Sequence, residues 1–148
     1  MKRALGLPVL ALWLSVTATV AEADYLARNR MIAAGIPAKA GFFEVFQRAT
    51  AGPPDYFCVA GEYVRYGLRL TASTDIYVVR GMGPSVTRPG RRSVVFSYVK
   101  YDDIPDMSAA EKGYSVSISR PGYFLSAGHS AAFCDASRRR FRRSGLAF

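Results

Sequence analysis

The spacing of apolar residues predicts one amphipathic helix and several strands along the chain. Residues 42–48 are aromatic and β-branched, lie between a glycine and a pair of prolines, and predict a strand. Residues 55–68 carry apolar side chains at intervals of three and four behind Asp55, a good N-cap, which is typical of a helix. Residues 75–80 and 93–99 are rich in Val, Ile, Tyr and Phe and predict a hairpin with a long loop.

Four other segments give weaker patterns. Residues 24–34, followed by a glycine, predict a short helix. Residues 108–111 form a capping box that predicts one helical turn, and residues 114–119 alternate apolar side chains with serines, which predicts a half-buried strand. The pattern at 122–133 fits either a strand or a helix.

The order of these elements predicts an α+β fold. Sequential strands favour a small antiparallel sheet of about four strands, packed on one face by the helix near 55–68. Residues 24–137 are predicted to form a single domain, and residues 138–148 a basic, mobile C-terminal tail. The helix carries three tyrosines, Tyr56, Tyr63 and Tyr66. We expect the helix to bury them; alternatively, they could form a stacking platform for a sugar or base.

Residues 1–23 have the features of a cleaved secretory signal peptide. A basic start precedes an apolar run at 5–20, and a small-residue cleavage site ends at Ala23. An uncleaved anchor is the alternative, but the run is interrupted by Pro8 and is shorter than the ~20 residues that span a bilayer. The sequence therefore predicts export, to periplasm or medium, with cleavage following Ala23 and no transmembrane segment in the mature chain.

Two cysteines remain after the predicted cleavage, Cys58 and Cys134. An even number of cysteines in an oxidising compartment favours a disulfide, here closing a loop of about 76 residues and stabilising the fold by roughly 4 kcal/mol. The alternative is a reactive thiolate at Cys58. That role is usually supported by a nearby second cysteine, which the sequence lacks, so we expect the disulfide.

Basic residues dominate the predicted mature chain. Without Lys2, Arg3 and Glu22, the 20 basic and 11 acidic residues become 18 and 10, a net charge of +8. This predicts an anionic partner: anionic lipid, polysaccharide or an acidic protein, with nucleic acid unlikely for an exported chain. The excess of arginine over lysine fits bidentate anion recognition, or simply GC-rich codons.

The arginines gather in two segments, which are the predicted binding residues. In the glycine-rich loop at 81–92, backbone N–H groups could approach an anion; the alternative is a solvated hairpin tip. In the C-terminal segment, five charges surround one aromatic residue. The arginines of the loop and of the C-terminal segment are Arg88, Arg91, Arg92, Arg138, Arg139, Arg140, Arg142 and Arg143.

Catalytic chemistry has weak candidates. His129 is the only histidine. With Ser126 or Ser130 as nucleophile and Asp135 as orienting carboxylate it could form a hydrolase site, although the residues more simply fit a small-residue turn or the start of a helix. Glu44 and Glu62 could serve as paired carboxylates only if they shared a cleft.

Neither a metal site nor a cofactor is predicted. One histidine and two paired cysteines do not make a zinc site, and the acidic cluster lacks the spacing of a calcium loop and is interpreted as a solvated connection: Asp102, Asp103 and Asp106.

Three functional hypotheses follow. The favoured one is a non-catalytic accessory or binding domain that contacts anionic envelope components or an acidic protein. The alternatives are a small secreted hydrolase using His129 and a serine, and an inhibitor of a secreted enzyme that presents the 88–92 loop to an acidic cleft. Oligomeric state stays open.

Overall fold

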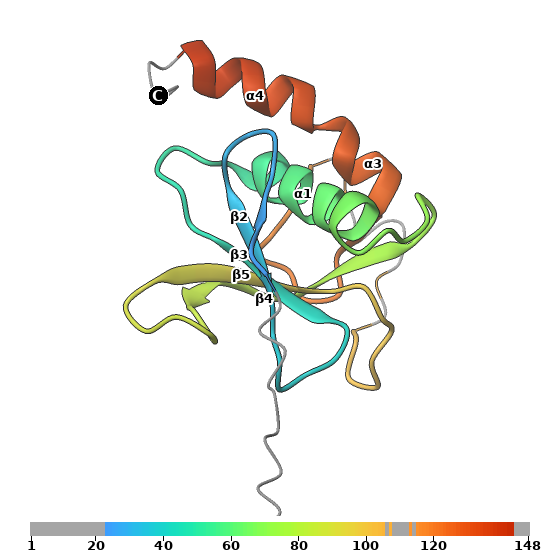
Figure 1. Cartoon of the computed structure of the whole chain (residues 1–148). Helices are drawn as coiled ribbons and strands as arrows, with labels where there is room; N and C mark the ends of the chain where they lie inside the picture. The colour runs from blue at the N-terminus through green and yellow to red at the C-terminus, as the bar shows by residue number, and fades with distance from the viewer. Residues whose placement is uncertain (1–22, 106, 108–112, 114, 144–148) are drawn as a thin grey trace, which may run out of the picture.

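The structure is a computed structural model that describes residues 23–105, 107, 113 and 115–143. In this part of the chain, a curled antiparallel sheet of six strands carries the helices on one face (Figure 1). This confirms the α+β class and corrects the expected number of about four strands. The strands are β1 (Tyr25–Leu26), β2 (Ile32–Gly35), β3 (Phe42–Phe46), β4 (Asp75–Pro84), β5 (Arg92–Ser97) and β6 (Phe124–Ser126).

The sheet order is β1-β2-β3-β5-β4-β6. The helical elements are α1 (Pro53–Glu62), continued by a π-helical turn η1 (Tyr63–Gly67), then α3 (Ala127–Ala132) and α4 (Cys134–Arg143). Both the strand predicted at 42–48 and the hairpin predicted from 75–80 and 93–99 are confirmed, as β3 and as β4–β5. No helix among the residues described is long and apolar enough to cross a membrane.

The helix predicted at 24–34 is wrong, because these residues form the β1–β2 hairpin. β1 pairs with β2, and β2 in turn pairs with β3. Asn29 explains the difference: its side-chain oxygen accepts a hydrogen bond from the Met31 N–H at 3.1 Å, and Arg30 adopts the left-handed conformation with φ 62°. Asparagine favours such turns. The small apolar residues of this segment would also suit a helix, but here they form paired strands.

The predicted helix at 55–68 is confirmed with a shifted start. Its N-cap is Gly52, and the Asp55 carboxylate accepts a hydrogen bond from the Gly52 N–H at 2.7 Å, as in a capping box. Tyr56 and Tyr63 are buried in the core, whereas Tyr66 is exposed. The three tyrosines therefore do not share one surface, and no common stacking platform forms.

Aromatic rings fill the space between α1 and the sheet. The Phe57 ring centroid lies 5.3 Å from that of Phe96 and 5.8 Å from that of Tyr123, both in edge-to-face geometry. Such pairs each contribute roughly 0.5–1.5 kcal/mol beyond their buried area. This packing holds α1 in place against the sheet.

The segment after β5 differs partly from expectation. Residues 115–119 are not a strand, although Val116 and Ile118 still pack against the core, so the alternation indicates burial without strand pairing. Tyr114 and the capping box at 108–111 lie outside the described residues. The ambiguous segment 122–133 contains both alternatives, β6 followed directly by α3.

The predicted disulfide is confirmed: Cys58 of α1 is bonded to Cys134 at the start of α4, and both residues are fully buried. Residues 138–143, predicted as part of a mobile tail, continue α4. Phe141 and Ser137 face the protein and are buried. Residues 144–148, like most of the proposed signal peptide (1–22), lie outside the described residues.

Candidate functional site

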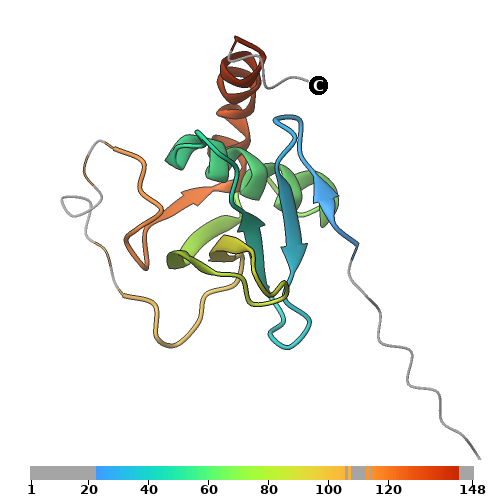
Figure 2. The same cartoon turned by 90° about the vertical axis from the view of Figure 1, so that its left-hand side faces the viewer.

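Five arginines line one groove beside α4. They come from the β1–β2 turn, from the residues after β3, and from two successive turns of α4, and the turn lies next to α4 in both views (Figures 1 and 2). Asn29 and Phe141 complete the lining of this groove, which is open to solvent and has a volume of about 30 Å³. We call this feature the arginine groove: Arg28, Arg30, Arg48, Arg138 and Arg142.

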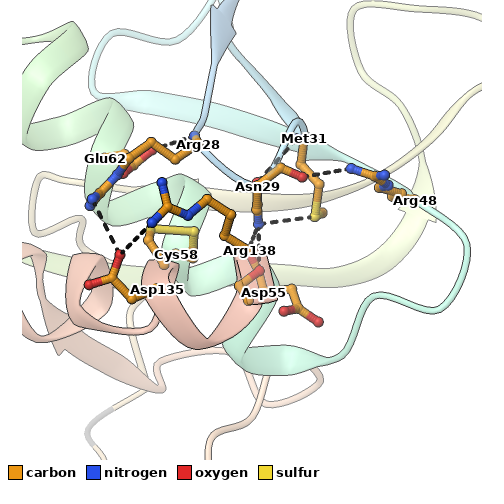
Figure 3. Close-up of a disulfide and its surroundings, with 11 residues drawn as sticks. Arg28, Asn29, Met31, Arg48, Asp55, Cys58, Glu62, Asp135 and Arg138 are labelled. Carbon is orange, nitrogen blue, oxygen red and sulfur yellow. Dashed lines mark hydrogen bonds and ion pairs between the residues drawn. A yellow bond between two sulfur atoms is a disulfide. The ribbon is translucent and has the colours of Figure 1, made fainter. Parts of the chain in front are cut away.

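Asn29 holds the two walls of the groove together. Its side-chain amide, which is 2% exposed, donates hydrogen bonds to the Asp55 carbonyl at 3.1 Å and to the Ser137 hydroxyl at 3.0 Å (Figure 3). The same side chain closes the β1–β2 turn through Met31. One buried amide therefore ties the turn to α1 and to α4, and buried hydrogen-bonded groups of this kind rigidify their surroundings.

The floor of the groove is an arginine stacked on an aromatic ring. The Arg48 guanidinium lies 4.3 Å from the centre of the Phe141 ring and donates a hydrogen bond to the Asn29 carbonyl at 2.6 Å. A cation over an aromatic face is attracted by the ring, so its side chain has already lost conformational freedom before a ligand binds. Arg48 is thus held in place before any ligand arrives.

Two carboxylates neutralise part of the groove. Glu62, which is buried, pairs with Arg28, whose pKa is raised mainly by this hydrogen bond. Asp135 lies 3.6 Å from Arg28 and 3.9 Å from Arg138, but its side chain is 60% exposed and such pairs are weak. Glu62 and Asp135 therefore offset part of the positive charge of Arg28 and Arg138.

A wider depression of about 250 Å³ adjoins the groove at Arg30 and Arg48. Arg91 lines its far side, with Phe46 and Met31 contributing apolar surface. Of the loop arginines predicted to bind, Arg91 is therefore the one that the fold brings toward the groove.

The remaining α4 arginines lie on the other side of the helix. Arg139, Arg140 and Arg143 line a separate surface, which we call the outer flank of α4. Arg140 is engaged internally, because its guanidinium lies 2.7 Å from the buried Asp55 carboxylate. The predicted C-terminal cluster is therefore divided between the groove and this flank.

The segment predicted as a loop at 81–92 extends β4 to Pro84 and begins β5 at Arg92, so the loop itself is 85–91. This loop does bind a carboxylate, but one from the protein itself. The fully buried Glu44 side chain accepts hydrogen bonds from the N–H groups of Val86 at 2.9 Å and Thr87 at 3.0 Å, and from the hydroxyls of Ser85 at 2.8 Å and Ser93 at 2.6 Å. Burial alone would raise the pKa of Glu44, but these bonds outweigh it and lower the pKa to about 2.

The loop arginines are partly engaged as well. Arg88 forms an ion pair with Asp24, and its guanidinium lies 4.5 Å from the centre of the Phe46 ring. Arg91 lies over the same ring at 5.2 Å, and Arg92 is exposed at the start of β5. The loop thus has fewer free donors than its sequence indicates.

The catalytic candidates do not form a hydrolase arrangement. Ser126 caps α3 by accepting a hydrogen bond from the backbone N–H of the exposed His129 at 3.3 Å, and Ser130 is fully buried without a hydrogen-bond partner in the described part of the chain. Neither hydroxyl bonds to the imidazole in these residues. Glu44 and Glu62 are held by separate partners, the loop and Arg28, so they do not act as a carboxylate pair.

Within the described ranges, no group of three or more His, Cys, Asp or Glu side chains is arranged to hold a metal ion. Asp102 and Asp103 are exposed in a turn, as expected of a solvated connection, and Asp106 lies outside the described residues.

Comparison with known protein families, with curated proteins and with solved structures finds no match for this chain. The site therefore has to be interpreted from its own geometry. Sequence reasoning missed Arg28, Arg30 and Arg48, which are isolated from the two arginine clusters. The sequence did contain one signal for Arg28 and Arg30, which flank Asn29. Asparagine favours turns, and a turn would place both arginine side chains at the tip of a hairpin.

Proposed function

We propose that this protein is a non-catalytic binding domain of the cell envelope that holds an anionic partner in the arginine groove. The observation that carries the proposal is the convergence of arginines from three segments on one concave, positively charged surface. Arginine suits this role because its guanidinium offers paired donors to phosphate, sulfate or carboxylate oxygens.

The strength of the interaction follows from the charges. Next to an anionic surface each arginine contributes about 1 kcal/mol, and this attraction decreases within a Debye length, about 8 Å at physiological salt. Five groove arginines offset by two carboxylates provide a substantial attraction that salt should suppress. The rigid seating of Arg48 and of α4 supports the proposal further, since little ordering is needed on binding.

Export is the second part of the proposal. It rests on the pattern of residues 1–23, and the buried Cys58–Cys134 disulfide is compatible with an oxidising compartment. N-terminal sequencing of the protein recovered from cells tests it directly. We expect Asp24 as the first residue in the envelope or medium; a reduced chain beginning at Met1 in the cytosol would contradict export.

Binding is tested with vesicles. The purified protein should be retained on phosphatidylglycerol vesicles and not on neutral phosphatidylcholine vesicles, and retention should decrease steeply between 50 and 500 mM salt, as expected from roughly 1 kcal/mol per arginine at low screening. Truncation after Ser137 is a poor test, because it also removes the buried Phe141. Retention independent of salt, or none at all, would contradict the proposal.

A further inference from the structure

We propose that the arginine groove and the wider depression beside it together bind one linear acidic polysaccharide, whose successive carboxylates pair with Arg142, Arg30 and Arg91. This inference rests on the proposed function: it names the class of the anionic partner and extends its site beyond the groove to the β4–β5 loop. It is carried by the way the two hollows meet, by the arginines that lack an internal acid, and by the strands beneath.

The two hollows meet at Arg30 and Arg48, which line both of them. Arg142 lines the groove and Arg91 lines the depression, so these two residues mark the outer ends of the site. Both hollows are open to solvent, and an extended chain can therefore lie along them. A small anion in either hollow reaches one of the two outer arginines, whereas a chain that spans both hollows reaches them together.

The sheet places the arginines of the depression side by side. β3 pairs with β5, and just beyond β3 the Gln47 N–H still donates a hydrogen bond to the Arg92 carbonyl at 2.8 Å. This register brings Arg91 opposite Arg48, while the β1–β2 turn brings Arg30 to the other side of Arg48. Neighbouring strands lie about 4.8 Å apart, so Arg30 and Arg91 start about 10 Å from each other. Charges that recur along a polymer can meet such a row one after another.

Three exposed arginines of the two hollows have no acidic partner in the described part of the chain. Arg30, Arg91 and Arg142 make no ion pair with any of these residues. Arg91 is also oriented, because its guanidinium lies 5.2 Å from the centre of the Phe46 ring. A guanidinium group without an internal acid offers its paired donors to a carboxylate of the ligand.

The strands beneath the depression disfavour an acidic peptide. Peptides that bind to sheets pair with an exposed strand edge, which supplies main-chain hydrogen bonds. β2, β3 and β5 are interior strands, each paired on both sides. A peptide lying over them would find no sheet partner for its N–H and C=O groups, whereas a polysaccharide has no amide backbone to satisfy.

Two other anionic partners fit the hollows less well. Single-stranded nucleic acid stacks its bases on aromatic side chains, but Phe46 and Phe141 are 2% and 4% exposed, and arginine guanidinium groups lie over both rings. A bilayer surface is flat and meets only the rims of the hollows, whereas a single polymer chain can lie inside them. Among the anionic partners of an exported protein, the site therefore favours an acidic polysaccharide.

Matched control arginines lie beside the site. Arg92 directly follows Arg91, carries the same charge and is exposed, but it does not line the depression. Arg139 lies on the same helix as Arg142, but it belongs to the outer flank of α4. A polyanion attracted by net charge alone would depend equally on the two members of each pair.

Titration calorimetry with galacturonate oligomers of one, two, four and eight units tests the inference on the purified protein at constant low salt. We expect the tetramer to bind about tenfold more tightly than the monomer, because its carboxylates reach both hollows. Arg142→Gln and Arg91→Gln should each weaken tetramer binding about tenfold through loss of charge-assisted hydrogen bonds. Arg139→Gln and Arg92→Gln should each weaken it by less than about threefold.

The dependence on chain length distinguishes a ligand that spans both hollows from general attraction. Arg91→Gln should reduce the gain from monomer to tetramer to about threefold or less, because the chain then meets no free charge in the depression. The thermal midpoints of these variants should be unchanged, since the substituted side chains are exposed. Equal losses within each pair of variants, or a gain with length that does not depend on Arg91, would overturn the polysaccharide site.

Oligomers of glutamate and of thymidylate with eight charges test the other macromolecules. We expect both to bind about fivefold more weakly than the galacturonate octamer, because they lack a strand edge and exposed rings to bind to. Equal or tighter binding of either would overturn the polysaccharide and indicate an acidic protein or a nucleic acid. Salt-dependent retention on phosphatidylglycerol vesicles would then persist and leave the broader proposal standing, whereas its loss would contradict the proposed function itself.

Discussion

The β4–β5 loop and α4 both carry arginines but have opposite roles. Both segments are rich in arginine and neither shows its role in the sequence. In the loop, the backbone N–H groups of Val86 and Thr87 are occupied by the buried Glu44 carboxylate, so its anion-binding capacity is used inside the protein. In α4, burial of Cys134, Ser137 and Phe141 turns most of the arginines outward.

This contrast shows that the position of an internal carboxylate decides what a basic segment can do. Glu44 converts a glycine- and arginine-rich loop into a structural element, whereas the acids near α4 offset only part of its charge. The loop should therefore respond to substitution mainly through stability, and α4 mainly through binding.

Removal of the disulfide should have the largest effect on stability. The variant Cys58→Ala with Cys134→Ala releases the start of α4 from α1, and the chain-entropy estimate for a 76-residue separation is roughly 4 kcal/mol. Urea unfolding of the variant and of the oxidised protein measures the loss. A loss below about 1 kcal/mol would show that packing of Phe141 and Asn29 alone seats α4.

Glu44→Gln should destabilise the protein by about 3 kcal/mol, because an amide cannot accept all the hydrogen bonds that converge on this buried carboxylate. Asp135→Asn is the control, since this carboxylate is exposed and should change stability by less than about 0.5 kcal/mol. Equal effects in chemical unfolding would remove the distinction between the loop and α4.

Glu44 also predicts a pH dependence of stability. Its pKa is about 2 in the folded protein and 4.5 when unperturbed, so the unfolded chain binds the proton more readily. The stabilisation is therefore complete above pH 5 and is lost as the pH falls from 5 toward 2, by about 3 kcal/mol for this group. Acid titration of the unfolding free energy should show that this part of the loss is missing in Glu44→Gln; identical curves would contradict it.

The smallest effect is expected at the tip of the β1–β2 turn. Arg30→Asn should raise stability by about 0.5–1 kcal/mol, because asparagine adopts the left-handed conformation more easily than arginine. Thermal unfolding checks this, with Arg142→Gln as a control that removes the same charge without relieving backbone strain. A destabilisation by Arg30→Asn would mean that the arginine side chain supports the turn.

The sequence predicted the elements with strong periodicity and missed those set by tertiary contacts. The helix at 55–68, the strand at 42–48, the β4–β5 hairpin and the disulfide were all visible as patterns or counts. The helix predicted at 24–34 was wrong because small apolar residues suit a helix as well as a strand. The turn at Asn29 and the pairing of β2 with β3 make these residues strands. The helical continuation at 138–143 was hidden because one aromatic, Phe141, provides most of its burial.

The candidate site was predictable in part. Arg138 and Arg142 were identified by their cluster, but Arg28, Arg30 and Arg48 join them only because the hairpin turn, the end of β3 and α4 meet around Asn29. The internal role of Glu44 was likewise invisible, since its partners are more than forty residues away in the sequence. Contacts across such separations have no local signature.

The most direct test compares two charge-matched double variants on phosphatidylglycerol vesicles at low salt. Arg30→Asn with Arg142→Gln removes two charges from the groove, and Arg88→Gln with Arg92→Gln removes two from the loop. At about 1 kcal/mol per arginine, the groove variant should bind about 30-fold more weakly, and the loop variant should stay within about threefold of the unmodified protein. Equal losses, or a greater loss in the loop variant, would contradict the groove as the binding surface.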